Sequence, residues 1–156
     1  MIRLKLVEQA DKTVLWNLLQ KYFYEMSACY DLEMDSAGNY AYSYFDAYFE
    51  DANRSAYFIT DNNALIGFVM INDHSYIHDT IDYAIAEFTI FPKYRRKRYA
   101  EEAVRRIFQE RRGKWELKFS GHNLPASAFW MKTTAPYRPS VSSFGDTEKV
   151  LSFLVK

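Results

Sequence analysis

The spacing of apolar residues predicts a strand and then two helices in the first third of the chain. Residues 2–7 alternate between apolar and charged side chains, which is the period of a half-buried strand. Behind Asp11, a candidate N-cap, apolar residues recur every three or four positions and predict a helix. This helical stripe comprises Val14, Leu15, Leu18, Leu19, Tyr22, Phe23 and Met26. The polar and aromatic segment 27–53 predicts a loop followed by a short helix near 40–50.

Three apolar runs separated by turn residues occupy the middle of the chain. Residues 56–60 and 65–71 flank the turn 61–63 and predict a hairpin. A third run over 84–91 stops at Pro92, which cannot donate to a strand ladder. Together these runs predict three consecutive strands.

Helix and strand periods then alternate to the end of the chain. A helical stripe is formed by Ala100, Ala103, Val104, Ile107 and Phe108, and Gly113 stands where a left-handed residue would end that helix. The later elements are a strand at 115–119, a helix opened by Asn123-Leu124-Pro125, and two strands at 141–144 and 150–155. The order β-α-α-β-β-β-α-β-α-β-β predicts one mixed α/β domain over residues 1–156.

Composition narrows the class of protein. The chain is 49% hydrophobic and 26% charged, as expected for a globular domain with one core. No apolar run approaches the roughly 20 residues that cross a bilayer, and the charges near Met1 are not those of a signal peptide. The single Cys29 excludes an internal disulfide. These features predict a cytoplasmic protein without a membrane partner.

The zero net charge hides a strong asymmetry along the sequence. Ten of the 20 Lys and Arg residues lie between Lys93 and Lys114, beside only three acids. Residues 1–92 hold 14 acids against five bases, a formal charge of −9. A nucleic-acid-binding module using the basic stretch is one interpretation. However, no recognition motif accompanies that stretch, and the acidic segment would repel a phosphate backbone, so we expect no nucleic-acid partner.

The segment that follows the 84–91 strand has features that are typical of an anion-binding site. A strand that stops at Pro92 leads through a basic turn into a helix, whose first turn offers free N–H groups and a positive dipole end. The turn holds Arg95, Arg96, Lys97 and Arg98. The alternative interpretation is a solvated helix entrance without a ligand.

The same residues carry a family resemblance. Phe88 to Ala100 (FTIFPKYRRKRYA) resembles the acetyl-CoA motif of the GNAT superfamily, a strand V-x-P-x-Y-R followed by [QR]-x-x-G-x-[GA]. Asn123 to Trp130 (NLPASAFW) is similar to the second GNAT motif, N-x-x-A followed by an aromatic pair. The resemblance implies a mixed, mostly antiparallel sheet with a splayed central strand pair and helices on both faces. It also implies an N-acetyltransferase that uses acetyl-CoA and no metal.

The resemblance also implies which residues hold acetyl-CoA. Main-chain groups of the strand would bind the pantetheine arm, N–H groups of the turn and helix start would cradle the pyrophosphate, and the basic side chains could reach the 3′-phosphate. The residues so assigned are Phe88, Thr89, Ile90, Arg95, Arg96, Lys97, Arg98, Tyr99, Ala100, Glu101 and Asn123. One departure is Arg98, where the family has glycine: its side chain either points outward and adds a phosphate contact or weakens binding.

Three residues are candidates for the proton transfers of such a reaction. Glu87 resembles the glutamate that many GNAT members use as a general base, and Glu116 on the next strand is a second candidate. The usual acid is a tyrosine seven residues after the motif asparagine, but that position is Trp130, which leaves Tyr137 as a substitute. An acid is dispensable if the thiolate leaves unassisted. These departures keep open a second interpretation, an acyl-CoA-binding protein without catalysis.

The acceptor and the quaternary structure are less constrained. Seven acids and no base lie between Glu25 and Asp51, interleaved with tyrosines and phenylalanines. We hypothesise that this segment steers a cationic small-molecule or peptide amine, the alternative being a solvated loop packed on the core. Many GNAT proteins dimerise, so a homodimer is possible. The pair His74 and His78 lacks further ligands and predicts no metal site.

Overall fold

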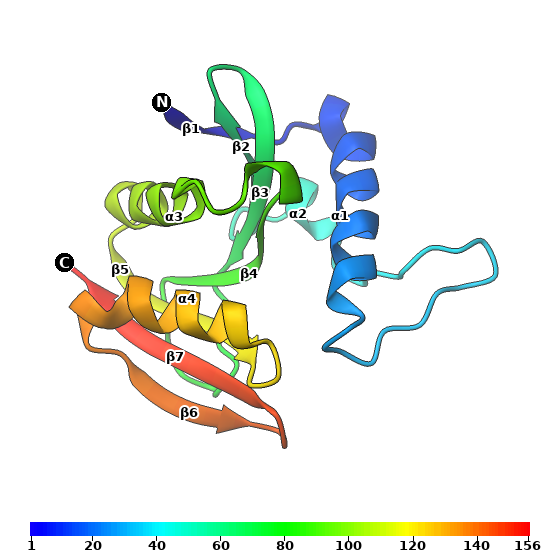
Figure 1. Cartoon of the computed structure of the whole chain (residues 1–156). Helices are drawn as coiled ribbons and strands as arrows, with labels where there is room; N and C mark the ends of the chain where they lie inside the picture. The colour runs from blue at the N-terminus through cyan, green and yellow to red at the C-terminus, as the bar shows by residue number, and fades with distance from the viewer.

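The computed structural model describes all of residues 1–156 and has one seven-stranded sheet with helices on both faces (Figure 1). The strands are β1 (Ile2–Leu6), β2 (Ser55–Asp61), β3 (Ala64–Asn72), β4 (Tyr83–Ile90), β5 (Gly113–Ser120), β6 (Ser140–Phe144) and β7 (Glu148–Val155). The helices are α1 (Lys12–Met26), α2 (Ala47–Glu50), α3 (Tyr99–Glu110) and α4 (Leu124–Thr134). Single 3₁₀ turns span Gln9–Asp11, Pro92–Tyr94 and Ala135–Tyr137. The predicted order of strands and helices is therefore confirmed.

The alternating side chains of the central strands build two separate cores. On β2 and β3, Phe58 and Met70 belong to the core covered by α1 and α2. Their neighbours Ile59 and Val69 face the other way, into the larger core beneath α3 and α4. Figure 1 shows α1 and α3 on opposite sides of these strands. The sheet thus separates two layers of helices, as a three-layer α/β domain requires.

The sheet divides between β4 and β5, its one parallel pair. The strand order is β1-β2-β3-β4-β5-β7-β6, and β4 pairs with β5 only over Tyr83–Ile85 against Trp115–Leu117. Beyond that, β4 continues along β3 as far as Ile90, while β5 continues along β7 as far as Ser120. A bulge places Ala86 as an extra residue on β4. The two strands therefore part, which confirms the mostly antiparallel sheet with a splayed central pair.

Three local predictions need correction. Gly113 does not cap α3 in the left-handed region: it is the first residue of β5, with φ +145°, where an added Cβ would lie 2.5 Å from an Asp82 carboxylate oxygen. The helix expected near 40–50 is the single turn α2. Asp11 precedes α1 without a side-chain capping hydrogen bond, because it already belongs to a 3₁₀ turn. No helix has the length and apolarity needed to cross a membrane.

Candidate active site

A cleft of about 440 Å³ opens where β4 and β5 part. One wall is the end of β4, the opposite wall is β5, and α1 and α4 close the sides. The lining residues that were predicted from the sequence are Phe88, Thr89, Ile90, Arg95, Ala100 and Asn123. The structure therefore brings residues from both sequence motifs to one cavity.

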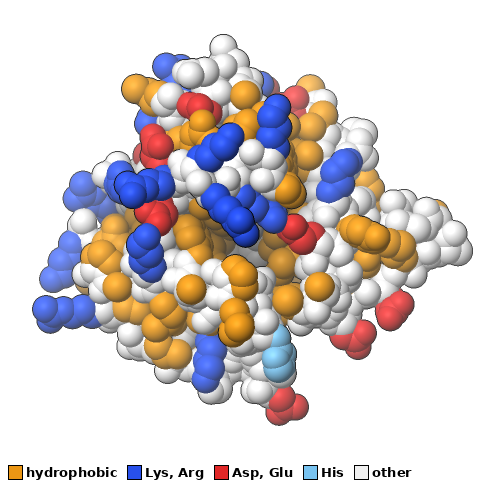
Figure 2. Space-filling view, viewed as in Figure 1, with side chains coloured by type: hydrophobic (Ala, Val, Ile, Leu, Met, Phe, Trp, Pro, Cys, Tyr) orange, Lys and Arg blue, Asp and Glu red, His pale blue; other side chains and the backbone are white.

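The turn before α3 presents unpaired main-chain donors. The N–H groups of Arg96, Lys97 and Arg98 donate to no acceptor in the chain, and the helix dipole of α3 adds partial positive charge beside them. The three side chains are exposed and make no ion pair. Figure 2 shows Lys and Arg side chains gathered on this face around a central hollow. This arrangement is suited to a polyanion such as a pyrophosphate.

Two arginines of this turn adopt the backbone conformation that favours glycine. Arg96 has φ 61° and Arg98, the N-cap of α3, has φ 64°. A left-handed conformation costs a residue with a Cβ roughly 1–2 kcal/mol. Arg98 thus preserves the shape of the loop in which the family has glycine, and its exposed side chain points away from the core.

Other residues predicted to hold phosphate are occupied by internal contacts. Arg95 binds both oxygens of Glu25 on α1 (2.7 and 2.6 Å) and the main-chain oxygen of Ile90 (2.7 Å). This pairing lowers the pKa of Glu25. The side chain of Glu101 accepts a hydrogen bond from Lys132 on α4 at 2.6 Å. Arg95 and Glu101 therefore tie helices to the cleft instead of offering free side chains to a ligand.

Of the remaining predicted cofactor residues, all but Tyr99 line the cleft. The Phe88 ring stacks on Phe129, with centroids 6.1 Å apart, and meets Trp130 edge-on at 5.4 Å. Asn123 caps α4, its side-chain oxygen accepting from the N–H of Ala126 at 3.2 Å. The Tyr99 hydroxyl donates to Asp61 at 3.0 Å, so of this residue only the main chain faces the turn.

Glu87 lies in a second cavity of about 210 Å³ that adjoins the cleft. Five residues line both spaces: Tyr22, Met26, Tyr30, Ala86 and Lys118. The remaining lining of the second cavity is Phe23, Leu32, Tyr76 and Glu87 itself. The bulge at Ala86 brings Glu87 to the point where β4 and β5 part.

The environment of Glu87 makes its carboxyl group a weaker acid than an ordinary glutamate. Burial raises the pKa of its carboxyl to about 7, although the nearby Tyr22 hydroxyl and the Lys118 ammonium favour the ionised form. Burial and the Glu87 charge also raise the pKa of Tyr22, Tyr42 and Tyr76. Near neutral pH, Glu87 can therefore both take and release a proton, whereas the tyrosines around it remain protonated.

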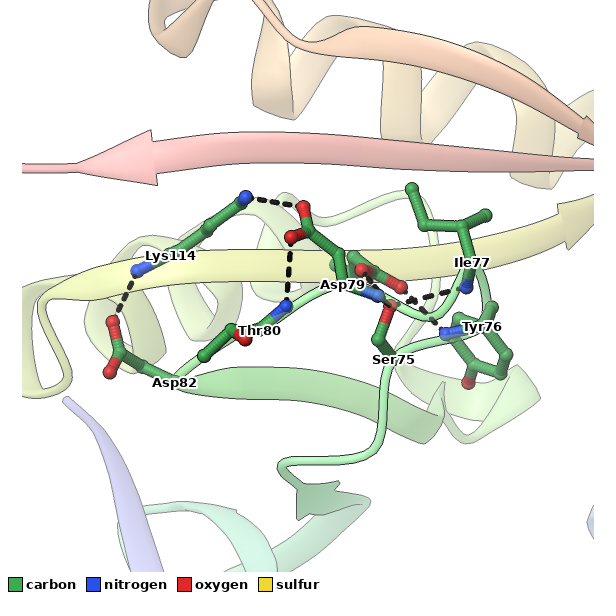
Figure 3. Close-up of polar contacts among 8 residues, drawn as sticks. Ser75, Tyr76, Ile77, Asp79, Thr80, Asp82 and Lys114 are labelled. Atoms are coloured by element: carbon green, nitrogen blue, oxygen red, sulfur yellow. Dashed lines mark hydrogen bonds and ion pairs between the residues drawn. The ribbon is translucent and has the colours of Figure 1, made fainter.

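Glu116, the second candidate base, is fully buried outside both cavities. Its two oxygens accept hydrogen bonds from the Ser75 hydroxyl (2.5 Å) and the Tyr76 N–H (2.8 Å). Figure 3 shows the loop before β4 held against β5 by these bonds and by the Lys114 main chain and side chain. Glu116 is thus placed to hold the loop that carries Tyr76, which lines the cavity of Glu87.

The structure does not bring Tyr137 into the cleft. The 3₁₀ turn after α4 directs its ring against Phe108 and Phe153, at centroid distances of 5.6 and 5.7 Å. Trp130 occupies the position expected for an acid and has no acidic hydrogen to give. Sequence reasoning missed Tyr22, Tyr76 and Lys118, since the cavity that they share with Tyr30 exists only once four separate segments meet, whereas Tyr30 itself belongs to the segment between Glu25 and Asp51 that was expected to face the acceptor. No local pattern could have identified them.

Most of the acids between Glu25 and Asp51 also have structural partners. Asp46 pairs with Lys12 at 2.8 Å, Asp51 with Arg54 at 3.4 Å, and Asp35 accepts hydrogen bonds within its own turn. Only Glu25 lines the cleft, and none lines the cavity of Glu87. His74 lies 3.0 Å from an Arg54 nitrogen, and no group of three or more metal-ligating side chains is found.

Solved structures of acetyltransferases resemble the fold over nearly the whole chain. An acetyltransferase from Thermus thermophilus is 16% identical, with a TM-score of 0.68 over 99% of this chain and 97% of that chain. Spermidine N-acetyltransferase from Vibrio cholerae, solved with CoA and spermine, is 19% identical, with a TM-score of 0.67 over 99% and 95%. Ribosomal-protein-S18-alanine N-acetyltransferase from Escherichia coli is 10% identical, with a TM-score of 0.67 over 100% and 95%. At these identities, the likeness establishes the fold alone.

The sequence itself carries a family match. No curated protein is similar enough to this chain to match it. The sequence model of the acetyltransferase (GNAT) family, in contrast, matches residues 14–134, which include the cleft from α1 to the end of α4. Because this match spans most of the chain, the protein belongs to the GNAT acetyltransferase family, and the acyltransferase class expected from its motifs is confirmed.

Proposed function

We propose that the protein transfers an acetyl group from acetyl-CoA to a primary amine by direct attack of the amine on the thioester. The observation that carries this proposal is the junction between the cleft at the β4–β5 splay and the cavity of Glu87. An acyl group in the cleft and an amine in the cavity would meet at the residues that line both. Holding two reactants in this way supplies much of the rate enhancement of a bimolecular transfer.

The residues present suit acetyl-CoA as the acyl-donating substrate. The unpaired N–H groups of Arg96 to Arg98 and the start of α3 fit its pyrophosphate. The exposed side chains of Arg96, Lys97 and Arg98 are free to bind its 3′-phosphate. The edge of β4 that faces away from β3 is unpaired beyond Ile85, which leaves main-chain groups of Phe88 and Thr89 for the pantetheine amides, whereas the Ile90 oxygen already accepts from Arg95.

Glu87 acts as the general base in this proposal. The amine nitrogen forms a bond to the thioester carbon, its surplus proton passes to the Glu87 carboxylate, and the carbon–sulfur bond breaks. A carboxyl with a pKa of about 7 suits proton transfer at neutral pH. The thiol of CoA has an ordinary pKa of about 8.5, so its thiolate can leave unassisted and take a proton from water. No side chain is therefore needed in the acid role expected of Tyr137.

Calorimetric titration with acetyl-CoA and with free CoA, followed by an assay of thiol release with primary amines, tests the proposal. We expect micromolar binding that weakens in Arg96→Ala/Arg98→Ala. The matched control Arg3→Ala/Lys5→Ala removes two exposed charges from the edge strand β1 and should bind normally. Binding without turnover of any amine would mean an acyl-CoA-binding protein, and absence of binding would refute the site itself.

A further inference from the structure

Resting on the proposed function, we propose that the acceptor is a monoamine that carries one aromatic or similarly flat apolar group. Polyamines and peptides are then poor acceptors. The proposal follows from the walls, the charge and the size of the cavity that holds Glu87, taken in turn.

Four of the nine residues that line this cavity carry aromatic rings. Tyr22, Phe23, Tyr30 and Tyr76 supply rings from α1, the loop after it and the loop before β4, and Met26, Leu32 and Ala86 complete the apolar surface. Tyr22 and Phe23 already pack at a centroid distance of 5.6 Å. A ligand ring would extend these contacts, since aromatic pairs attract one another beyond the effect of their buried area.

The cavity offers only one carboxyl group to an ammonium. Its other charged residue, Lys118, pairs with Glu148 at 3.1 Å and lies over the rings of Tyr76 and Phe144, 5.1 and 4.7 Å from their centroids. The second ammonium of a polyamine would meet Lys118 and find no second carboxylate among the lining residues, because Glu148 is paired with Lys118 and does not line the cavity. Burial of an unpaired charge is costly, so the cavity disfavours such acceptors.

The acidic segment between Glu25 and Asp51 adds no carboxylate to this cavity. Its carboxylates lie outside the cavity, and the pairs of Asp46 with Lys12 and of Asp51 with Arg54 neutralise part of their charge. Their long-range attraction would draw any cationic amine towards the molecule. It cannot select among amines once the ligand lies beside Glu87.

The volume is sufficient for a single ring. A cavity of about 150 Å³ is enough to hold benzene, and this one measures about 210 Å³. The difference accommodates a short arm that carries the amine to Glu87. A peptide would also bring main-chain amides that require partners, yet the Tyr76 hydroxyl is already directed to the Ile85 main-chain oxygen at 3.3 Å.

The first test ranks acceptors on the unaltered chain at saturating acetyl-CoA. We expect kcat/KM for 2-phenylethylamine to exceed that for spermidine and for an alanine-initiated tetrapeptide by at least about tenfold. Butylamine, which shares the primary amine but lacks the ring, should fall between them because it buries less apolar surface. Equal or faster turnover of spermidine or the peptide would overturn the inference and leave the acetyltransferase proposal intact. Turnover of no amine would overturn both.

The second test fills the cavity. Leu32→Trp places a large side chain in the wall, and Met34→Trp adds the same group to an exposed position of the same loop, where the native side chain is 45% exposed. We expect Leu32→Trp to lower kcat/KM for 2-phenylethylamine at least about tenfold while acetyl-CoA binds with unchanged affinity. Met34→Trp should match the unaltered chain. Equal activity of the two variants would mean that the acceptor does not occupy this cavity. Should Leu32→Trp lose acetyl-CoA binding through misfolding, the acceptor ranking decides.

Discussion

The two regions at either end of the candidate active-site cleft present different chemical groups. At the α3 end, the binding surface consists of unpaired main-chain N–H groups and the exposed side chains of Arg96, Lys97 and Arg98. At the Glu87 end, it is a cavity lined by nine residues, four of them aromatic, from segments far apart in the sequence. One end is positively charged, whereas the other is largely apolar and holds one carboxyl group.

Because of this difference, we expect acetyl-CoA affinity and the choice of amine to depend on different residues. A surface of main-chain donors depends on backbone shape, so it tolerates the replacement of glycine by Arg98 as long as the left-handed conformation persists. A cavity of side chains depends on the identity of every wall residue. Substitutions at the α3 end should therefore change acetyl-CoA affinity and leave the choice of amine alone. Substitutions around Glu87 should do the reverse.

The largest expected effect comes from Glu87→Gln, which keeps the shape of the side chain and removes the base. We expect kcat to fall about 10²–10⁴-fold, with acetyl-CoA affinity by calorimetry unchanged within about twofold. Glu33→Gln, an exposed carboxylate outside both cavities, is the matched control and should retain full activity. Loss of activity in Glu33→Gln would revive a direct role for the acidic segment. Full activity in Glu87→Gln would remove Glu87 from the chemistry.

The pH dependence tests the same residue without relying on one variant. Because burial raises the pKa of Glu87 to about 7, the base is protonated below that pH. The ratio of kcat/KM between the unaltered chain and Glu87→Gln should thus fall about tenfold per pH unit below 7. This ratio cancels the titration of the amine itself. A ratio that is constant between pH 5 and pH 8 would contradict the assignment.

The raised pKa of Glu87 also determines in which direction its contribution to folding stability changes with pH. The folded pKa of Glu87 lies above its ordinary value of 4.5, so folding favours the protonated form. The contribution is fully present below about pH 4.5 and is lost as the pH rises through 7. Relative to Glu87→Gln, the unaltered chain should therefore lose Tm over this range, which thermal melts at pH 4.5 and pH 8 can measure.

The sequence predicted the fold and one end of the cleft better than the other end. The stop at Pro92 and the cap at Asn123 are local signals, and they located the turn before α3 and the start of α4. Arg95 has the same local pattern as Arg96, but its partner Glu25 lies 70 residues away in sequence. Glu116 and Tyr137 were likewise plausible from order along the chain. Only the packing of distant segments shows that Glu116 holds the loop before β4 and that Tyr137 packs in the core.

A smaller effect should distinguish Arg95 from its neighbour Arg96. Arg95→Ala breaks the paired contacts to Glu25, so we expect a loss of about 1 kcal/mol, which corresponds to a Tm lower by about 2–4 °C. Arg96→Ala should leave Tm unchanged and weaken acetyl-CoA binding several-fold, more so at low salt, because its exposed charge faces solvent. Melting curves and calorimetry on both variants check this. Identical behaviour of the two variants would mean that the ion pair with Glu25 does not govern Arg95.

The smallest effect isolates the backbone at the α3 end. Arg98→Gly and Arg98→Ala remove the same charge, so both should weaken acetyl-CoA binding equally, by about two- to threefold. Only glycine relieves the cost of φ 64°, and we expect Arg98→Gly to be more stable than Arg98→Ala by roughly 0.5–1 kcal/mol. Thermal melts measure that difference. Equal stability would mean that the turn shifts to accept a Cβ. The arrangement of the main-chain N–H groups at the α3 end would then depend on the side chains of the turn.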